Sequence, residues 1–386
     1  MAKRAQNEGT IYKRADGRWE GAITLPGTGG KRKRFYGDTQ REVREKLTAL
    51  HHDLNQGLPV VTERQTVAQF LDAWLADVVK STVRPKTYES YTQVVRLYLA
   101  PSLGRHQLAK LEPQHVQAMM NAMGARAEED GGPLSPRTVQ YARAVLRRAL
   151  GKALKWGKVA RNVATLVDPP PVDRHEMRAF DPAEARRFLD AVRGDRLEAL
   201  YAVALSLGLR QGEALGLRWQ DVDLDAGLLH VRVALQRLKG QGPRLAEPKT
   251  RQSRRTLPLP APLIAQLRAH RKRQLEDRLL AGGRWVGDTW GLVFANRTGG
   301  PLDPTHVVKA FKGHLRRADL PEIRFHDLRH ACASLLVAQG THPREVMEIL
   351  GHSTITLTMN TYSHVMPQAK RTALDALAGA LAVAGD

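Results

Sequence analysis

The chain has 386 residues, of which 42% are hydrophobic, and its formal net charge is +21 at pH 7. This length exceeds the size at which a single hydrophobic core stops growing, so we expect two or three domains. So large an excess of positive charge favours a polyanionic partner, either nucleic acid or an anionic membrane surface, over a role in solubility alone. No apolar run approaches the roughly 20 residues of a membrane span, so we expect no membrane association.

The cysteine content and the first residues bear on the compartment. Cys332 is the only cysteine, so no intrachain disulfide can form. Residues 1–7 lack the apolar segment of a signal peptide. Both features predict an intracellular, cytoplasmic protein.

Residues 9–36 predict a small three-stranded β-sheet. Two β-prone runs are separated by an Asp-Gly turn, and a glycine-rich turn precedes a third, basic run. A helix is expected from about Thr39 to Gly57. The basic run lies beside aromatic residues and could dock in a DNA groove, whereas the simpler alternatives are a solvated strand or a localisation signal. The candidate DNA contacts here are Lys31, Arg32, Lys33 and Arg34.

A helical module is predicted after a linker at residues 58–65. The sequence of residues 66–69 resembles a capping box that opens a helix. Further helices are expected at about 85–100, 113–124 and 136–156. The last of these has an apolar stripe, and its other faces carry basic residues and no acid, which suits the gripping of phosphates. The candidate DNA contacts on this helix are Arg137, Arg143 and Arg147.

A Pro-rich, polar segment at residues 168–178 marks a second boundary. A helix is expected to begin near Asp181, a β-region spans roughly 228–259, and mainly helical sequence follows from about 261. The fold class predicted for the whole chain is therefore multidomain α+β. It comprises a small N-terminal sheet with one helix, an all-α bundle, and a mixed α/β, mainly helical domain.

Tyr362 lies downstream of the sequence His326-Asp-Leu-Arg-His330. A tyrosine that attacks phosphorus needs cations to hold the non-bridging oxygens and acids or bases to move protons, and this set of residues supplies both. Tyr362 considered alone would be a half-buried structural phenol. Its neighbours favour a nucleophile instead.

Two upstream segments add to this set. Arg210 lies in a glycine-flanked turn, and Glu213 could hold the plane of its guanidinium, although a surface Arg–Glu pair is the simpler interpretation. Lys249 lies near a turn between two expected strands, where it could protonate a leaving oxygen or simply be solvated. Cys332 is expected in an apolar core.

These residues resemble the catalytic motifs of the tyrosine recombinase family, and of phage integrases in particular. The resemblance covers the mixed domain and extends into the helical module and the N-terminal sheet. The motifs that carry it, in the family's order and approximate spacing, are Arg210, Lys249, His326-Asp-Leu-Arg329, Leu350-Gly-His352 and Tyr362. The resemblance implies a site-specific DNA recombinase that integrates or excises a phage or other mobile element in a bacterial cell.

The resemblance also implies a role for each cationic residue. Arg210, Arg329 and His352 would hold the non-bridging oxygens and stabilise the pentacoordinate phosphorane. Glu213 would support Arg210.

The covalent chemistry follows from the same resemblance. Tyr362 would form a 3′-phosphotyrosyl link, Lys249 would protonate the 5′-oxygen leaving group, and His326 would assist proton transfer at the nucleophile. No cofactor or metal is then expected, and the sequence contains neither a Walker loop nor a cysteine-based zinc motif. A zinc site at the three histidines 326, 330 and 352 is disfavoured, because its fourth ligand is unaccounted for.

The resemblance assigns residues 1–60 to an arm-type DNA-binding domain and 66–165 to a core-binding, SAM-like domain. Residues 175–370 would be the catalytic domain and 371–386 a C-terminal tail helix, which could pack on its own domain or on a neighbouring protomer. The partners implied are double-stranded DNA attachment sites and a homotetramer on DNA. An excision directionality factor and a host DNA-bending protein are further candidates.

Three rival functions share parts of this pattern. A Xer-like resolvase of chromosome or plasmid dimers would use the same chemistry, but the basic N-terminal sheet argues against it. A type IB topoisomerase would relax supercoils without pairing sites. A catalytically silent DNA-binding regulator is disfavoured because all the catalytic residues are present. The bases that are recognised depend on which side chains reach the groove edges.

Overall fold

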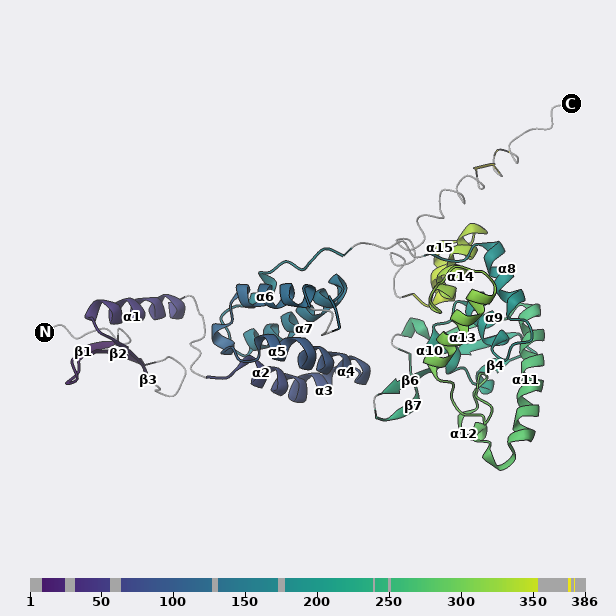
Figure 1. Cartoon of the computed structure of the whole chain (residues 1–386), viewed down its shortest axis with the longest axis horizontal. Helices are drawn as coiled ribbons and strands as arrows, with labels where there is room; N and C mark the ends of the chain where they lie inside the picture. The colour runs from purple at the N-terminus through teal and green to yellow at the C-terminus, as the bar shows by residue number, and fades with distance from the viewer. Residues whose placement is uncertain are drawn as a thin grey trace. The chain divides into compact units, whose positions relative to one another are not determined.

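The computed structural model of the chain describes residues 9–24, 32–55, 64–126, 131–172, 178–238, 240–248, 251–352, 374–375 and 378. The chain divides into two compact units, Met1–Arg174 and His175–Asp386, whose helices and strands are labelled in Figure 1. Among the helices within these ranges, none has both the length and the apolar character needed to cross a bilayer.

The first unit begins with a three-stranded antiparallel sheet in the order β1-β2-β3, followed by a helix that packs on one face. The elements are β1 (Thr10–Lys13), β2 (Trp19–Thr24), β3 (Arg32–Gly37) and α1 (Gln40–Asn55). Ile23 of β2 packs with Val43, Leu47 and Leu50 of α1 in a small core of their own. The sheet and the helix that the sequence predicted are confirmed.

The rest of the first unit is a helical module around a second core. Its elements are α2 (Val67–Trp74), the π-helical turn η1 (Leu75–Val79), α3 (Lys80–Thr82), α4 (Pro85–Val94), the π-helical turn η2 (Val95–Leu99), α5 (Ala100–Leu103), η3 (Leu108–Lys110), α6 (Pro113–Gly124), α7 (Pro136–Lys155) and η5 (Val163–Thr165). The predicted capping box is present, because the amide N–H of Gln69 donates to Thr66 Oγ1 at 3.2 Å and that of Thr66 donates to Gln69 Oε1 at 3.0 Å. The predicted apolar stripe of α7 is buried along its whole length.

The second unit combines helices with a three-stranded sheet in the order β4-β5-β8 and a two-stranded β6-β7 hairpin. Its helical elements are α8 (Pro182–Ala191), α9 (Glu198–Leu207), α10 (Gln211–Leu215), η6 (Trp219–Asp221), η7 (Arg251–Ser253), α11 (Ala261–Ala281), η8 (Gly282–Arg284), α12 (Gly287–Trp290), α13 (Pro304–Arg317), α14 (Asp327–Ala338) and α15 (Pro343–Leu350). Its strands are β4 (Val222–Asp223), β5 (Leu228–Val231), β6 (Ala234–Leu238), β7 (Gly242–Ala246) and β8 (Arg255–Pro258).

Helix α9 is the centre of the second unit. Nearly all of its residues are buried, as expected for a helix that is apolar on every side. Tyr201 on α9 meets Phe188 of α8 and Phe311 of α13, with ring centroids 5.4 and 5.8 Å apart, and Phe311 also lies 5.7 Å from Phe325. This aromatic cluster packs α8 and α13 against α9, and α9 is the helix that ends at the candidate site.

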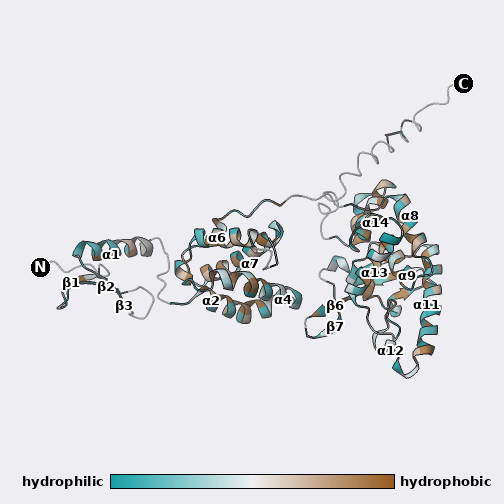
Figure 2. Cartoon of the chain, in the orientation of Figure 1, coloured by the Kyte–Doolittle hydropathy of each residue, from teal (hydrophilic) through white to brown (hydrophobic). Residues whose placement is uncertain are grey.

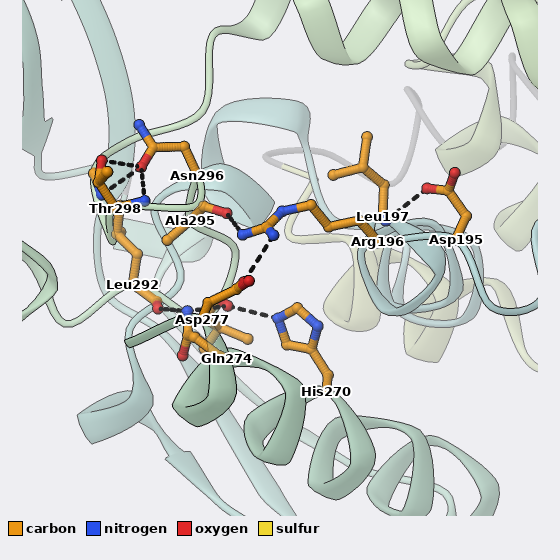
Figure 3. A network of polar contacts seen from close by, with 12 residues as sticks. Asp195, Arg196, Leu197, His270, Gln274, Asp277, Leu292, Ala295, Asn296 and Thr298 are labelled. Atoms are coloured by element: carbon orange, nitrogen blue, oxygen red, sulfur yellow. Dashed lines mark hydrogen bonds and ion pairs between the residues drawn. The ribbon is translucent and has the colours of Figure 1, made fainter. Parts of the chain in front are cut away.

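Helix α11 carries many hydrophilic residues along its length (Figure 2), and polar contacts join it to the segment 292–295 (Figure 3). The ring Nε2 of His270 lies 2.8 Å from the carbonyl oxygen of Val293, and Gln274 Nε2 donates to Leu292 O at 3.0 Å. Arg196 joins both parts, since it donates to Ala295 O at 3.1 Å and pairs with Asp277 at 2.7 Å. These bonds satisfy backbone carbonyls that have no partner in a sheet.

The aromatic cluster makes a test of this core possible. Phe311 is fully buried, so Phe311→Ala removes a ring and leaves a cavity. We expect the free energy of unfolding to fall by about 3–5 kcal/mol, as measured by chemical denaturation. Leu279→Ala is the control, because Leu279 is 82% exposed and its loss should change stability by no more than about 0.5 kcal/mol. Equal effects of the two substitutions would contradict this description of the core.

Candidate active site

The turn between α9 and α10 places Arg210. Helix α9 ends at Gly208, whose φ of +59° is left-handed, and Arg210 is the N-cap of α10. The amide N–H of Arg210 donates to Glu213 Oε2 at 3.1 Å, and its guanidinium Nη1 donates to Glu213 Oε1 at 2.6 Å. One carboxylate therefore caps the helix and holds the arginine. Glu213 is 4% exposed and Arg210 37% exposed, so the guanidinium remains partly open to a ligand.

Glu213 has a second cationic partner, Arg255 at the start of β8. The Nη2 atom of Arg255 lies 3.1 Å from Glu213 Oε2, and this side chain is only 6% exposed. Burial alone would raise the pKa of Glu213, but Arg255 and Arg210, together with the hydrogen bonds from Arg210, lower it below its usual value. Glu213 is thus an ionised carboxylate shared by two arginines.

The turn that ends α15 lies against both arginines. Arg210 Nη2 donates to the carbonyl oxygen of Gly351 at 3.1 Å, and Arg255 Nε donates to that of Ile349 at 2.6 Å. Gly351 has a φ of +64°, and a Cβ there would lie 2.9 Å from the carbonyl oxygen of Gln252. Only glycine fits this position without strain. The next residue is His352, which is 7% exposed.

Helix α14 supplies the remaining motif. Arg329 is 2% exposed, and its Nη1 donates to the carbonyl oxygen of Gly208 at 2.7 Å, which ties α14 to the turn before Arg210. Asp327 is bound by Arg324 through its side chain and backbone N–H, with Arg324 Nη2 2.8 Å from Asp327 Oδ1, and this pair fixes the start of the helix. The rings of His326 and His330 meet edge to face at 5.2 Å.

The pKa values of the three histidines of the site are all lowered, which favours their neutral forms. Burial, then Arg329 and Arg210, lower the pKa of His352 to about 3. Burial and then His326 lower the pKa of His330 to about 4. The pKa of His326 is lowered by burial and next by Arg329. A bound anion would offset the charge of the arginines, so the site is electrostatically prepared for one.

Cys332, on the next turn of α14, is not part of this chemistry. It is 3% exposed, and burial raises the pKa of its thiol to about 12. Its Sγ donates a weak hydrogen bond to the carbonyl oxygen of Ser206 at 3.5 Å. The core position expected for Cys332 is confirmed.

The structure brings most of the predicted site residues into one cluster. Its members are Arg210, Glu213, His326, Arg329 and His352, with Arg255 in addition. Two of the predicted catalytic residues, Lys249 and Tyr362, lie outside the residues that the structure describes.

Arg255 is the site residue that the motifs did not reveal. It lies in a run with several other basic residues, and composition does not distinguish them. The strand alternation would have done so, because Arg255, Leu257 and Leu259 point inward while Arg254 points outward. An inward-facing arginine requires a buried partner.

The basic residues predicted in the first unit divide into separate groups. Arg32 and Arg34 of β3 are exposed, whereas Lys33 points to the other face of the sheet, with its Nζ 5.6 Å from the ring centroid of Phe35. Lys31 lies outside the described residues. The four-residue basic run is therefore not a single patch.

On α7 the three candidates also differ in exposure. Arg137 and Arg147 are exposed, and Arg143 is half-buried. Near them, Arg148 donates to the hydroxyl of Tyr91 at 3.0 Å and lies over its ring, 5.5 Å from the centroid. Aromatic and cationic groups thus share this surface of the helical module.

The cluster in the second unit can hold a phosphoryl group. Guanidinium groups bind phosphate oxygens through parallel hydrogen bonds, and a neutral imidazole can donate one more. Fixed donors of this kind stabilise the charge that develops in a phosphoryl-transfer transition state. Within the described ranges, no three His, Cys, Asp or Glu side chains are arranged as a metal site.

Known proteins are similar to this chain over most of its length. Residues 178–369 match the phage integrase family, and residues 66–124 match the phage integrase N-terminal SAM-like domain. A tyrosine recombinase XerC-like protein of Caldanaerobacter subterraneus subsp. tengcongensis is 32% identical over 362 residues, which cover 90% of this chain and 91% of that protein. An integrase of Streptomyces ambofaciens is 33% identical over 345 residues, with 86% and 85% covered.

Solved structures share the fold. The Tn1549 transposon integrase in complex with transposon right end DNA has a TM-score of 0.68 at 23% identity, covering 81% of this chain and 100% of that one. A lambda integrase tetramer bound to a Holliday junction has a TM-score of 0.56 at 18% identity, with 90% and 96% covered. These likenesses agree with the predicted α+β architecture.

The glycine that precedes His352 gives a matched pair of substitutions. Gly351→Ala and Gly340→Ala both place a side chain at positive φ, at a cost of about 1 kcal/mol. Only the alanine at 351 would also meet Gln252 O and Arg255 Nη1, since nothing lies within 4 Å at 340. We expect Gly351→Ala to lower the free energy of unfolding by about 1–3 kcal/mol more than Gly340→Ala does. Equal losses in chemical denaturation would contradict the close packing of this turn.

The lowered histidine pKa values predict a pH dependence of stability. A histidine of the unfolded chain binds a proton near pH 6.5, whereas His330 in the folded protein binds its proton only near pH 4. The contribution to stability is therefore complete above pH 6.5 and is lost as the pH falls from there towards 4. We expect His330→Asn to lose less stability than the parent protein between pH 7.5 and 5. His306→Asn, at an exposed position, is the control, and parallel curves for all three proteins would refute the prediction.

Proposed function

Because the chain belongs to the phage integrase family of tyrosine recombinases, we propose that Tyr362 is the nucleophile that attacks a DNA phosphodiester. The protein is a site-specific recombinase that breaks and rejoins DNA strands. In the proposed step the Tyr362 oxygen bonds to phosphorus, the 5′-oxygen leaves, and a 3′-phosphotyrosyl link forms. A 5′-hydroxyl of the partner strand then attacks this link and releases the tyrosine, so the reaction consumes no nucleotide.

One observation carries the assignment of the phosphate-binding residues. Arg210 and Arg329, from separate elements, are both fixed against the α9–α10 turn, and the turn before His352 is bonded to Arg210. Their convergence supports a role in binding the non-bridging oxygens and stabilising the pentacoordinate phosphorane. Glu213 would then orient Arg210.

Proton transfer is assigned to two further residues. Lys249 would protonate the leaving 5′-oxygen, which would otherwise depart as an alkoxide. His326 is the N-cap of α14, and partial burial followed by the charge of Arg329 lowers its pKa, which favours a neutral imidazole able to accept a proton from the attacking phenol. The assignment of Lys249 follows the family motif. The assignment of His326 follows the family motif and its position at the start of α14.

DNA binding is proposed for both modules of the first unit. The division would be an arm-type domain at residues 1–60, a core-binding domain at 66–165, a catalytic domain at 175–370 and a tail helix at 371–386. The basic surface of α7 and the exposed Arg32 and Arg34 support contact with the phosphate backbone. The similar Tn1549 and lambda integrases are bound to DNA, and the lambda protein forms a tetramer on a Holliday junction. We extend both properties, a double-stranded attachment site and a homotetramer, to this chain.

The biological reaction is proposed to be integration and excision of a mobile element. The integrases of Streptomyces ambofaciens and Saccharopolyspora erythraea are similar to this chain over most of its length. The N-terminal sheet gives a second DNA-binding module, which simple resolution of chromosome dimers does not require. An excision directionality factor and a host DNA-bending protein would act on the same complex.

A covalent adduct tests the mechanism. The purified protein is incubated with attachment-site DNA nicked beside the cleavage position, so that the released end diffuses away. The site is obtained by sequencing the junctions of the element. We expect a protein–DNA adduct that survives denaturant, and Tyr362→Phe should abolish it while DNA binding remains. Tyr98→Phe, at a half-buried tyrosine of the helical module, is the matched control. Persistence of the adduct in Tyr362→Phe would refute the assignment of the nucleophile.

A further inference from the structure

We propose that Arg255 is a positioning residue for DNA cleavage, which holds Arg210 through Glu213 and holds the turn before His352 through Ile349. This inference rests on the proposed function, in which Arg210 and His352 bind the scissile phosphate. Arg255 itself would not touch DNA, because its side chain is 6% exposed. It would act by fixing the groups that do.

The contacts of Arg255 reach three separate segments. Its Nη2 lies 3.1 Å from Glu213 Oε2 on α10, and its Nε donates to Ile349 O on α15 at 2.6 Å. Its Nη1 donates to Ser253 O at 3.2 Å, in the η7 turn that follows Lys249 in the chain. One planar group therefore joins the element that carries Arg210, the turn that leads to His352 and the segment downstream of Lys249.

The chemistry requires a guanidinium at this position. Arginine presents its donors in a rigid, planar fork, so three acceptors in different directions can be bound at once. The ammonium group of a lysine is a single point on a flexible chain and cannot span the same three acceptors. Arg255→Lys keeps the charge but loses the bridge, which makes it the informative substitution.

The energetics favour a role in geometry over one in stability. A buried ion pair loses about as much in desolvation as it gains in attraction, so it is weak evidence for stability. Glu213 already has Arg210 as a partner. Burial, and then the like charge of Arg210, lowers the pKa of Arg255, whereas Glu213 raises it. A second guanidinium on the same carboxylate restricts its rotation, and thereby the direction in which Arg210 points.

Arg254, which directly precedes β8, provides a matched control. It has the same side chain as Arg255 but points outward, is 52% exposed, and pairs with Glu247 at 2.5 Å. The structure gives it no contact with Glu213 or with the 349–352 turn among the described residues. Arg254→Lys and Arg255→Lys therefore make the same change at neighbouring positions, of which one is exposed and the other buried.

The experiment measures single-turnover formation of the covalent adduct by the full chain on nicked attachment-site DNA. One substrate has a normal scissile phosphodiester, and the other has a methylphosphonate there, which replaces a charged non-bridging oxygen with a methyl group. DNA affinity is measured in the Tyr362→Phe background, and folding is checked by thermal unfolding. A neutral phosphorus centre needs less cationic stabilisation, so it tolerates a misdirected Arg210.

We expect Arg255→Lys to cleave the phosphodiester about 100-fold more slowly, as for a misplacement of about 1 Å, with DNA affinity unchanged. The deficit should shrink to less than about 10-fold on the methylphosphonate. Arg254→Lys should match the parent protein on both substrates. In a double-substitution cycle with Glu213→Gln, the double variant should be no slower than the slower single variant, because both act through one carboxylate.

Several results would overturn the proposal. An unchanged rate for Arg255→Lys, the same deficit on both substrates, or additive effects with Glu213→Gln would each do so. Loss of DNA affinity or of folding together with the rate would show that Arg255 is only structural. Absence of an adduct with the parent protein on both substrates would instead contradict the proposed function itself.

Discussion

Glu213 is an ionised carboxylate at 4% exposure, and each of its oxygens faces a guanidinium group, from Arg210 and from Arg255. A buried charge is tolerated only when it is paired and hydrogen-bonded, so the pairing of Arg255 with Glu213 favours the packing of β8 against α10. Arg210 and Arg255 then donate to carbonyl oxygens of Gly351 and Ile349, which adds the end of α15 to the same arrangement. The positions of Arg210, Arg255 and the end of α15 are thus linked through the hydrogen bonds and ion pairs around the carboxylate of Glu213.

The surrounding fold makes that arrangement rigid. Helix α9 is buried on all sides and ends at Gly208, whose carbonyl oxygen receives Arg329 from α14. Burial, together with neighbouring charges, lowers the pKa of the nearby histidines and so favours their neutral forms. The DNA-free site therefore places arginine side chains beside imidazoles whose neutral forms are favoured. This environment suits a phosphodiester, because the arginines would balance its negative charge when it binds. Under the proposed function, strand breakage would be stabilised here.

The sequence predicted the elements of the first unit well, because its signals are local. The capping box at Thr66 and Gln69 and the apolar stripe of α7 depend on neighbouring residues alone. It predicted less about the basic run of β3, where Lys33 turns towards the helix-covered face while Arg32 and Arg34 are exposed. The alternation of a strand divides such a run between two faces, and the composition of the run conceals this.

By itself, the sequence determined which groups suited to phosphoryl transfer the chain carries, through the order and spacing of Arg210, His326, Arg329 and His352. It also determined that Glu213 is near Arg210, because three residues on a helix bring side chains together. Only the tertiary structure decided that Arg255 shares the same carboxylate. That contact joins segments far apart in the chain, and which of several arginines is buried depends on how the segments pack, a property that no local pattern encodes.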